Sequence, residues 1–350
     1  MAIKKEEAFK QVDIQENYIL DIYGEAVFKR LLRDHTSSIS CLKDDGGCSN
    51  IIWATNNYDS LGDGYHFYDE ITIERITREN GGVIKPRVIK NRDEQKQRSR
   101  DKAEVFTPSW VCNKQNNLID EAWFGRKNVF NTEIDNPDGT HTWTATEGNI
   151  EFPNSLGKTW KDYVEEKRLE ITCGEAPYLV SRYDVTSSLI INVVDRIGLL
   201  DRKLRIVNEN TPSERTKTNL RYWQRWTQRA FASIYGYEWQ GDNLLIARES
   251  LLFTYIDNYF HKWNKYPRKN SLKKIATIIS CNLWQMDGLK CGIPGYLPKE
   301  LLPNSEQKII QFNEDDKVHP RERLCRIIEW EDVENLKGKE IVFKSLIANH

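Results

Sequence analysis

Residues 168–182, RLEITCGEAPYLVSR, are the stretch that decides the expected fold. Leu169 and Ile171 alternate with charged or polar neighbours, as in a short β-strand. Gly174 can adopt the backbone conformations of a tight turn, and the apolar residues from Tyr178 onward open a following helix. Such a strand, turn and helix place backbone N–H groups and a carboxylate where nucleotide-like ligands bind, although many α/β proteins use the same turn without a ligand.

Two later segments repeat this pattern. In residues 232–252 an apolar strand ends at Glu238, a polar QGD turn follows, and a helix continues from Leu244. In residues 274–289 a third apolar run, again interpreted as a strand, ends at Asp287. Side by side in a parallel sheet, these acids and those of the first segment would line one crevice at the carboxyl edge. An adenosine cofactor needs such a crevice, because its ribose hydroxyls and its adenine amine both donate hydrogen bonds.

Composition and charge leave the class of partner open. The 350 residues include 51 Lys or Arg and 52 Asp or Glu, and local charge clusters matter more for nucleic-acid binding than this balance. The length allows two domains or one elaborated domain. The seven cysteines form no CxxC pair, which favours reduced thiols of a cytoplasmic protein over a disulfide framework or a zinc site. Neither a signal peptide nor a membrane span is expected from the apolar runs.

Residues 1–102 are interpreted as an N-terminal α+β extension. Helical spacing of apolar residues predicts an amphipathic helix over 14–34, followed by a loop over 34–50. The run IIWA at 51–54 predicts a short buried strand, and alternation predicts another through Ile71, Ile73 and Ile76. Residues 85–102 hold eight Lys or Arg, a pattern typical of a solvated linker or of a phosphate-binding arm. The candidate phosphate contacts there are Arg87, Lys90 and Arg92.

Two helices and a hairpin are predicted in the remaining chain. Thr107 is placed as an N-cap and Pro108 in the first turn of a helix whose apolar face carries Trp110, Val111, Leu118 and Ile119. The turn NPDGT predicts a hairpin within 131–154. Arginines at every fourth position form one helical stripe beside Trp223 and Trp226, which suits a solvated face or nucleic acid. The members of this basic stripe are Arg221, Arg225 and Arg229.

Four segments, in order, resemble the S-adenosylmethionine-dependent amino-methyltransferases of restriction–modification systems, especially the adenine-N6 DNA enzymes. EVFTP at 104–108 resembles their motif before the first helix, and LEITCGEAPYL at 169–179 resembles their main cofactor motif. YGYEWQGDNLLIAR is similar to their second strand, whose acid binds the ribose, and WQMDGL to the third, whose acid meets the adenine amine. The cofactor-binding residues that this resemblance implies are Phe106, Thr107, Pro108, Glu170, Thr172, Cys173, Gly174, Glu175, Glu238, Trp239, Asp287 and Gly288.

The catalytic signature of that family, a polar residue followed by Pro-Pro and an aromatic residue, is absent, since no two prolines are adjacent. Asn57 and Tyr58 follow the strand at 51–54 and are the candidate substitutes, with an ordinary turn as the alternative. The long interval between Glu175 and Glu238 indicates an insertion around 185–230. Ala176 and Pro177 stand where the family would have a second glycine, a change that would narrow the cofactor pocket.

The resemblance implies an α/β fold, a Rossmann-like methyltransferase sheet with helices on both faces, in residues 103–350. It also implies an S-adenosylmethionine-binding protein of a DNA-modification system that methylates adenine N6 directly, without a metal. The alternative is a non-catalytic methyltransferase-like subunit that binds DNA or a partner chain supplying the catalytic loop. The chain lacks a convincing pair of acids followed by Glu-x-Lys, which would favour an endonuclease.

Overall fold

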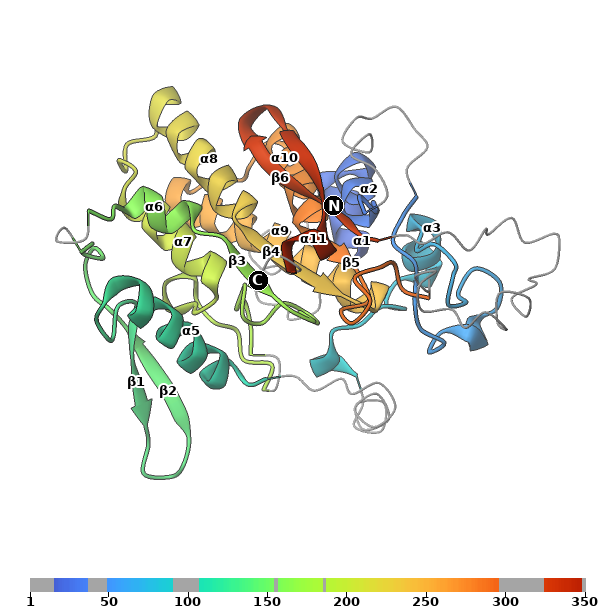
Figure 1. Ribbon diagram of the computed structural model, residues 1–350, viewed down its shortest axis with the longest axis horizontal. Helices are drawn as coiled ribbons and strands as arrows, with labels where there is room; N and C mark the ends of the chain where they lie inside the picture. Colours follow the sequence, from blue (N-terminus) through green and yellow to red (C-terminus); the bar gives the residue numbers. More distant parts are fainter. Residues whose placement is uncertain are drawn as a thin grey trace.

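Three parallel strands lie at the centre of the computed structural model, which describes residues 16–36, 49–90, 107–153, 157–184, 187–295 and 324–347 (Figure 1). The strands β3 (Arg168–Glu170), β4 (Ile234–Glu238) and β5 (Leu283–Gln285) pair in chain order. Glu170 is opposite Gly236, and Glu238 is opposite Gln285. The carboxyl ends of all three strands therefore meet at one edge of the sheet.

Pairs of helices connect the parallel strands. Helices α7 (Leu199–Glu209) and α8 (Lys217–Ala232) lead from β3 to β4, so most of the predicted insertion forms this connection. Helices α9 (Gly241–Trp263) and α10 (Lys269–Asn282) lead from β4 to β5. The prediction of a strand from residue 274 was wrong up to Asn282, because the buried residues Leu272, Ile275 and Ile279 follow helical spacing.

The two faces of the sheet have different covers. Ile234 and Leu283 face the large core beneath the helices, whereas Tyr237 and Trp284 face a second cluster of buried residues. That second cluster also contains Phe343 from α11 (Phe343–Ile347), and residues of the antiparallel hairpin β6 (Arg326–Asp332) and β7 (Lys337–Val342). The chain is thus a mixed α/β protein with small sheets, and a hairpin with one short helix covers the face where long helices were expected.

The N-terminal residues pack on the same large core. The predicted helix is divided into α1 (Glu16–Tyr18), a π-helical turn (Ile19–Tyr23) and α2 (Glu25–Leu32), with a break at Gly24, whose φ is 92°. The predicted strand at 51–54 is reduced to a single bridge from Ile52 to Glu70, and it ends at Ala54, whose φ is 50°. The predicted strand at 71–76 was wrong, because Ile73 and Ile76 are three residues apart and both point inward from the short helix α3 (Ile73–Ile76).

Helix α5 (Ser109–Phe124) and the hairpin of β1 (Asn131–Asp135) and β2 (His141–Ala145) occur where they were predicted. The predicted apolar face of α5 was wrong: Leu118 is 61% exposed, while Asn113, Asn116 and Asp120 are buried. The remaining elements are α6 (Trp160–Glu165) and the 3₁₀ turns Asp59–Leu61, Arg78–Asn80, Arg87–Ile89, Val193–Asp195 and Val333–Asn335. Among the helices described, none combines the length and apolarity needed to span a membrane.

Candidate ligand-binding site

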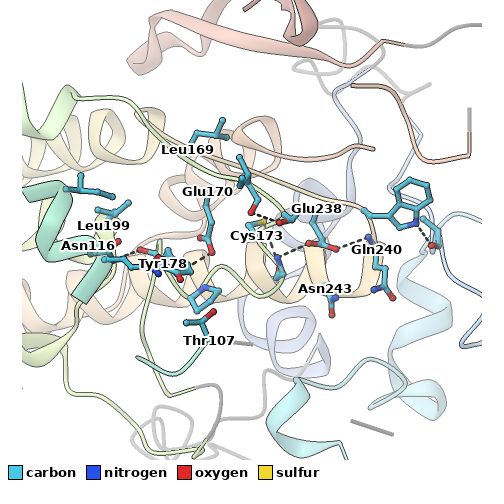
Figure 2. Close-up of a pocket in the computed structure, with 18 of the residues that line it drawn as sticks. Thr107, Asn116, Leu169, Glu170, Cys173, Tyr178, Leu199, Glu238, Gln240 and Asn243 are labelled. Atoms are coloured by element: carbon cyan, nitrogen blue, oxygen red, sulfur yellow. Dashed lines mark hydrogen bonds between the residues drawn. The ribbon is translucent and has the colours of Figure 1, made fainter. Parts of the chain in front are cut away.

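A pocket of about 970 Å³ opens at the carboxyl edge of β3 and β4 (Figure 2). The end residues of the two strands, Glu170 and Glu238, both line it. The turn after β3 and the residues after β4 form its floor, and α5 forms a wall. Of the predicted cofactor-binding residues, those that line this pocket are Thr107, Glu170, Thr172, Cys173, Gly174, Glu238 and Trp239.

The turn after β3 is held close to β4 by hydrogen bonds. Gly174 N–H donates to Glu238 Oε2 over 2.8 Å, and Cys173 N–H donates to Tyr237 O over 2.8 Å. Thr172, Gly174 and Ala176 all have positive φ values, of 46°, 54° and 61°. Left-handed residues prevent a regular helix within 172–176, and residues 177–184 form turns and bends, so the prediction that a helix starts near residue 178 was wrong. The chain instead turns back, and Glu170 accepts weak hydrogen bonds from the backbone N–H groups of residues 178 and 179.

The pocket is acidic and lacks a compensating cation among its described residues. Burial raises the pKa of Glu170 well above its ordinary value, and it also raises the pKa of Glu238. None of the described residues that line the pocket is Lys or Arg. A phosphate-bearing ligand would therefore meet two carboxylates and no basic side chain, whereas a cationic ligand would be stabilised by them.

Helix α5 supplies three lining residues, Gln115, Asn116 and Ile119, which the sequence reasoning had missed. Beyond β4, the missed residues are Gln240 and Asn243 at the start of α9. The three lining residues of α5 recur at helical spacing, but their side chains are too varied to predict a binding face. Polar residues in the first turn of a helix that follows a strand were a usable signal for Asn243.

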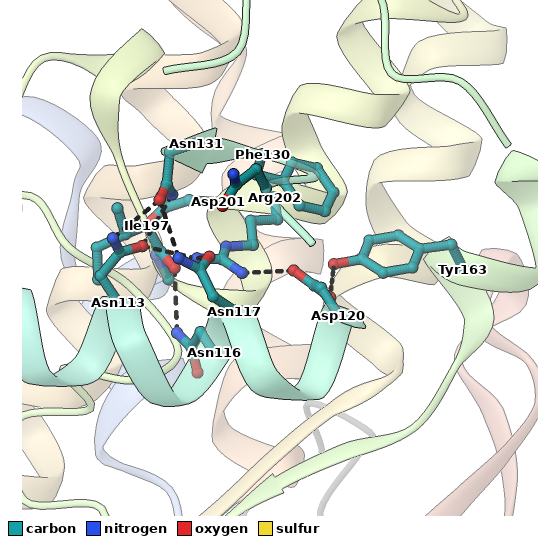
Figure 3. A network of polar contacts seen from close by, with 12 residues as sticks. Asn113, Asn116, Asn117, Asp120, Phe130, Asn131, Tyr163, Ile197, Asp201 and Arg202 are labelled. Atoms are coloured by element: carbon teal, nitrogen blue, oxygen red, sulfur yellow. Dashed lines mark hydrogen bonds and ion pairs between the residues drawn. The ribbon is translucent and has the colours of Figure 1, made fainter. Parts of the chain in front are cut away.

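A buried polar network fixes the position of α5 (Figure 3). Arg202 from α7 is 1% exposed and forms an ion pair with Asp120. Its Nη2 donates to Asn113 Oδ1 and Asn117 Oδ1, each over 2.8 Å. Asp120 also accepts a hydrogen bond from the hydroxyl of Tyr163 over 2.8 Å. The polar face of α5 is thus buried because α7 brings a matching cation to it.

Several predicted cofactor residues lie away from the pocket. Glu175 is buried and accepts a hydrogen bond from the hydroxyl of Tyr183 over 3.1 Å. Asp287 accepts hydrogen bonds from the N–H groups of residues 289 and 290, within the turn that also contains Gly288. The prediction of Thr107 as the N-cap was wrong, because Pro108 is extended and occupies that position before Ser109 starts α5. Phe106 lies outside the described residues. Residues 51–54 lie beside β5, where Ile52 forms two hydrogen bonds with the side chain of Gln285. Ala54 of this segment lines the pocket, whereas Asp287 does not.

The predicted catalytic pair is not among the described pocket-lining residues. Tyr58 is 9% exposed, and its ring centroid lies 4.5 Å from that of Trp53. Its hydroxyl donates to Asp242 Oδ2 over 2.7 Å. Asn57 is exposed in the turn beside it. This arrangement buries the aromatic ring that would have to stack on an extruded base.

The basic stripe is partly neutralised by carboxylates. Arg225 Nε lies 2.6 Å from Glu334 Oε1, and Arg229 forms an ion pair with Glu165. Because Glu165 ends the helix that precedes β3, this pair lies at the amino edge of the sheet, opposite the pocket. Arg221 is exposed, while the neighbouring Trp223 and Trp226 are buried and not available for stacking.

The basic run at 85–102 is described only in part. Lys90 is 8% exposed, whereas Arg92 and the side chain of Arg87 lie outside the described residues. Within the described ranges, no group of three His, Cys, Asp or Glu residues could hold a metal ion, and the five cysteines seen are free and buried.

Comparisons with protein-family models, curated proteins and solved structures find no match to this chain.

Proposed function

We propose that the pocket binds S-adenosylmethionine and that the chain belongs to a DNA-modification system that methylates an exocyclic amine, adenine N6. The observation that carries the proposal is the pair of buried carboxylates, Glu170 and Glu238, at the ends of adjacent parallel strands in one pocket. S-Adenosylmethionine carries a sulfonium cation, an α-ammonium and an α-carboxylate, so its net charge is positive and it has no phosphate. These charges suit a pocket whose described lining has two acids and no base.

The individual residues offer suitable contacts for such a ligand. Glu238 accepts backbone hydrogen bonds at 2.8 and 3.2 Å, and its remaining lone pairs can accept from ribose hydroxyls. The backbone of the Gly174 turn allows close approach, and the resemblance would place the methionine part beside Thr107, which lines the pocket together with Glu170. When bound, the cofactor would supply an activated methyl group. The chain itself would position the two reactants and exclude water.

Titration of the purified chain with S-adenosylhomocysteine by calorimetry tests the cofactor proposal. We expect saturable binding that Glu238→Ala weakens by tenfold or more, since a hydrogen bond to a charged group contributes about 1.5–3 kcal/mol. Glu214→Ala, at an exposed position outside the pocket, is the matched control and should bind normally. A folded wild-type chain that fails to bind the ligand would refute the proposal.

A second candidate is a non-catalytic methyltransferase-like subunit, for which a partner chain supplies the catalytic loop. The observation in its favour is the buried Tyr58, whose hydroxyl is occupied by Asp242. Transfer of a labelled methyl group from the cofactor to DNA by this chain alone distinguishes the two candidates. Transfer that is lost in Asn57→Ala would exclude the second candidate, whereas cofactor binding without transfer would favour it.

Binding of DNA by the basic stripe is a separate proposal and has a separate test. Arg221 is the residue to change, because it is exposed and, unlike Arg225 and Arg229, has no ion pair to a described residue. If the stripe contacts phosphates, affinity for duplex DNA should fall steeply with salt and fall again in Arg221→Glu. Lys127→Glu, another exposed charge reversal, is the control. Salt-independent binding would contradict a role for the stripe.

A further inference from the structure

The outer edge of β3 is open among the described residues, whereas the opposite edge of the sheet is covered. Beside β5, Ile52 forms two hydrogen bonds with the side chain of Gln285. Within the described sheet β3 pairs with β4 alone, and Arg168 N–H donates toward β4, to Ser233 O, over 2.9 Å. Backbone groups alternate in direction along a strand, so those of Leu169 point away from β4. They have no hydrogen-bond partner in the described ranges, and they form a template on which another strand can pair.

Two apolar side chains accompany this open edge. Leu169 is 44% exposed, and Ile171, directly after the strand, is 63% exposed. In the parallel register Leu169 is opposite Tyr235, which is buried in the second cluster with residues of β6. The cover that buries Tyr235 therefore does not extend over β3. Exposed edges are commonly protected by charged side chains such as lysine, whereas an apolar pair is suited to contacts with a neighbouring strand.

The open edge also borders the acidic pocket. Leu169 and Glu170 line the pocket from β3 (Figure 2), and Ile119 of α5, 38% exposed, lines it as well. Side chains alternate across a strand, so Glu170 lies on the face opposite to that of Leu169. Among the described residues its carboxyl accepts two long backbone hydrogen bonds, of 3.4 and 3.2 Å, and no Lys or Arg lines the pocket beside it. A strand placed along β3 would meet an apolar surface on one face and an acid without a cation on the other.

We propose that the outer edge of β3 binds an extended segment of a partner polypeptide by strand addition, with side chains in the order apolar, basic, apolar. Residues directly opposite each other on adjacent strands share a face. The apolar residues of the partner therefore lie beside Leu169 and Ile171, and the basic residue lies beside Glu170. Main-chain hydrogen bonds supply affinity, and the alternating side chains supply selectivity. The inference goes beyond the proposed function, because this surface does not require a bound cofactor.

A fluorescein-labelled peptide, Thr-Val-Arg-Val-Thr with a C-terminal amide, is the probe, and fluorescence anisotropy on the full chain without cofactor is the measurement. We expect saturable binding with a Kd below about 1 mM. Replacing the central arginine of the peptide by glutamate should weaken binding by about tenfold or more, because like charges would then face each other. N-methylation of both valines and N-methylation of the arginine should have unequal effects, since only alternate N–H groups of a strand point toward its neighbour.

One pair of variants tests the position of the peptide on the chain. Ile171→Ser should weaken binding by about tenfold, because the peptide covers this exposed apolar side chain. Leu118→Ser, at a position that is 61% exposed and outside the pocket lining, is the matched control and should bind normally.

Four results would each overturn the proposal: a folded wild-type chain that does not bind the peptide, equal affinity for the arginine and glutamate peptides, equal effects of the two methylation patterns, or unchanged binding in Ile171→Ser. Because the assay contains no cofactor, all four leave the proposal of S-adenosylmethionine binding standing. Failure of the chain to bind S-adenosylhomocysteine would in turn leave the strand-addition proposal standing.

Discussion

Replacing Arg202 by methionine should destabilise the chain strongly, because it leaves the carboxylate of Asp120 buried without its cation. Both side chains of this pair are 1% exposed. The substitution removes the ion pair, two hydrogen bonds of 2.8 Å to asparagines of α5, and the guanidinium that lies 5.3 Å from the Phe130 ring centroid. Tyr163 remains as a partner of Asp120. Breaking one side of a buried ion pair costs about 3–5 kcal/mol, which is the expected loss in the free energy of unfolding.

Urea denaturation followed by circular dichroism measures this loss. Arg225→Met is the matched control: the same substitution at an ion pair whose side chains are 51% and 38% exposed should cost about 1 kcal/mol or less. The double variant Arg202→Met with Asp120→Asn should recover part of the loss, since the buried charge is then gone. A loss in Arg202→Met no larger than in the control would refute the reasoning that α5 is held by a desolvated ion pair.

Three further predictions concern close packing and pH. Gly241→Ala should lower the free energy of unfolding by about 1–3 kcal/mol, because the added Cβ would collide with the backbone carbonyl of Ile52. Gly139→Ala is the control, since an added Cβ there strains only the backbone. A larger loss in Gly139→Ala than in Gly241→Ala would contradict the predicted collision. Burial raises the pKa of Glu170 and of Glu238, and a cationic ligand favours their charged forms, so affinity should rise as pH rises through these raised pKa values, and calorimetry in two buffers should detect proton release within that range. Without ligand, the stability of the fold should change with pH in the opposite direction. The stability contributed by Glu170 and Glu238 is complete below the ordinary glutamate pKa and is lost as pH rises through their raised pKa values. Urea midpoints that rise over this pH range would contradict the raised pKa values.

Local patterns predicted some elements well because those elements are decided locally. The strand ending at Glu238 and the helix after it occur as predicted, since the apolar run, the polar turn and the helical spacing are all continuous in sequence. The hairpin around residues 136–140 follows from its turn residues in the same way. The apolar run before β5 was misinterpreted because a buried helix and a buried strand both appear as unbroken apolar sequence.

The pocket could be predicted from sequence in part. The turn around Gly174 and the two strand-end glutamates were identified because acids after parallel strands meet at one edge. Asn116 was missed because an asparagine within a helix normally indicates solvent. The buried ion pair between Asp120 and Arg202 of α7, far along the chain, accompanies the inward orientation of that face.

The sequence by itself determined the order of the three strand-ending acids and the permissive turn after the first strand. Tertiary structure alone decided which of those acids share a pocket. Glu170 and Glu238 do, because β3 and β4 are neighbours and the turn at Gly174 bonds across them. Asp287 lies in a separate turn and accepts hydrogen bonds from that turn's N–H groups, while residues 51–54 pack beside β5 through two hydrogen bonds between Gln285 and Ile52. Contacts between residues so distant in sequence leave no periodic signal in the chain, so their effect on the pocket becomes visible only in the folded protein.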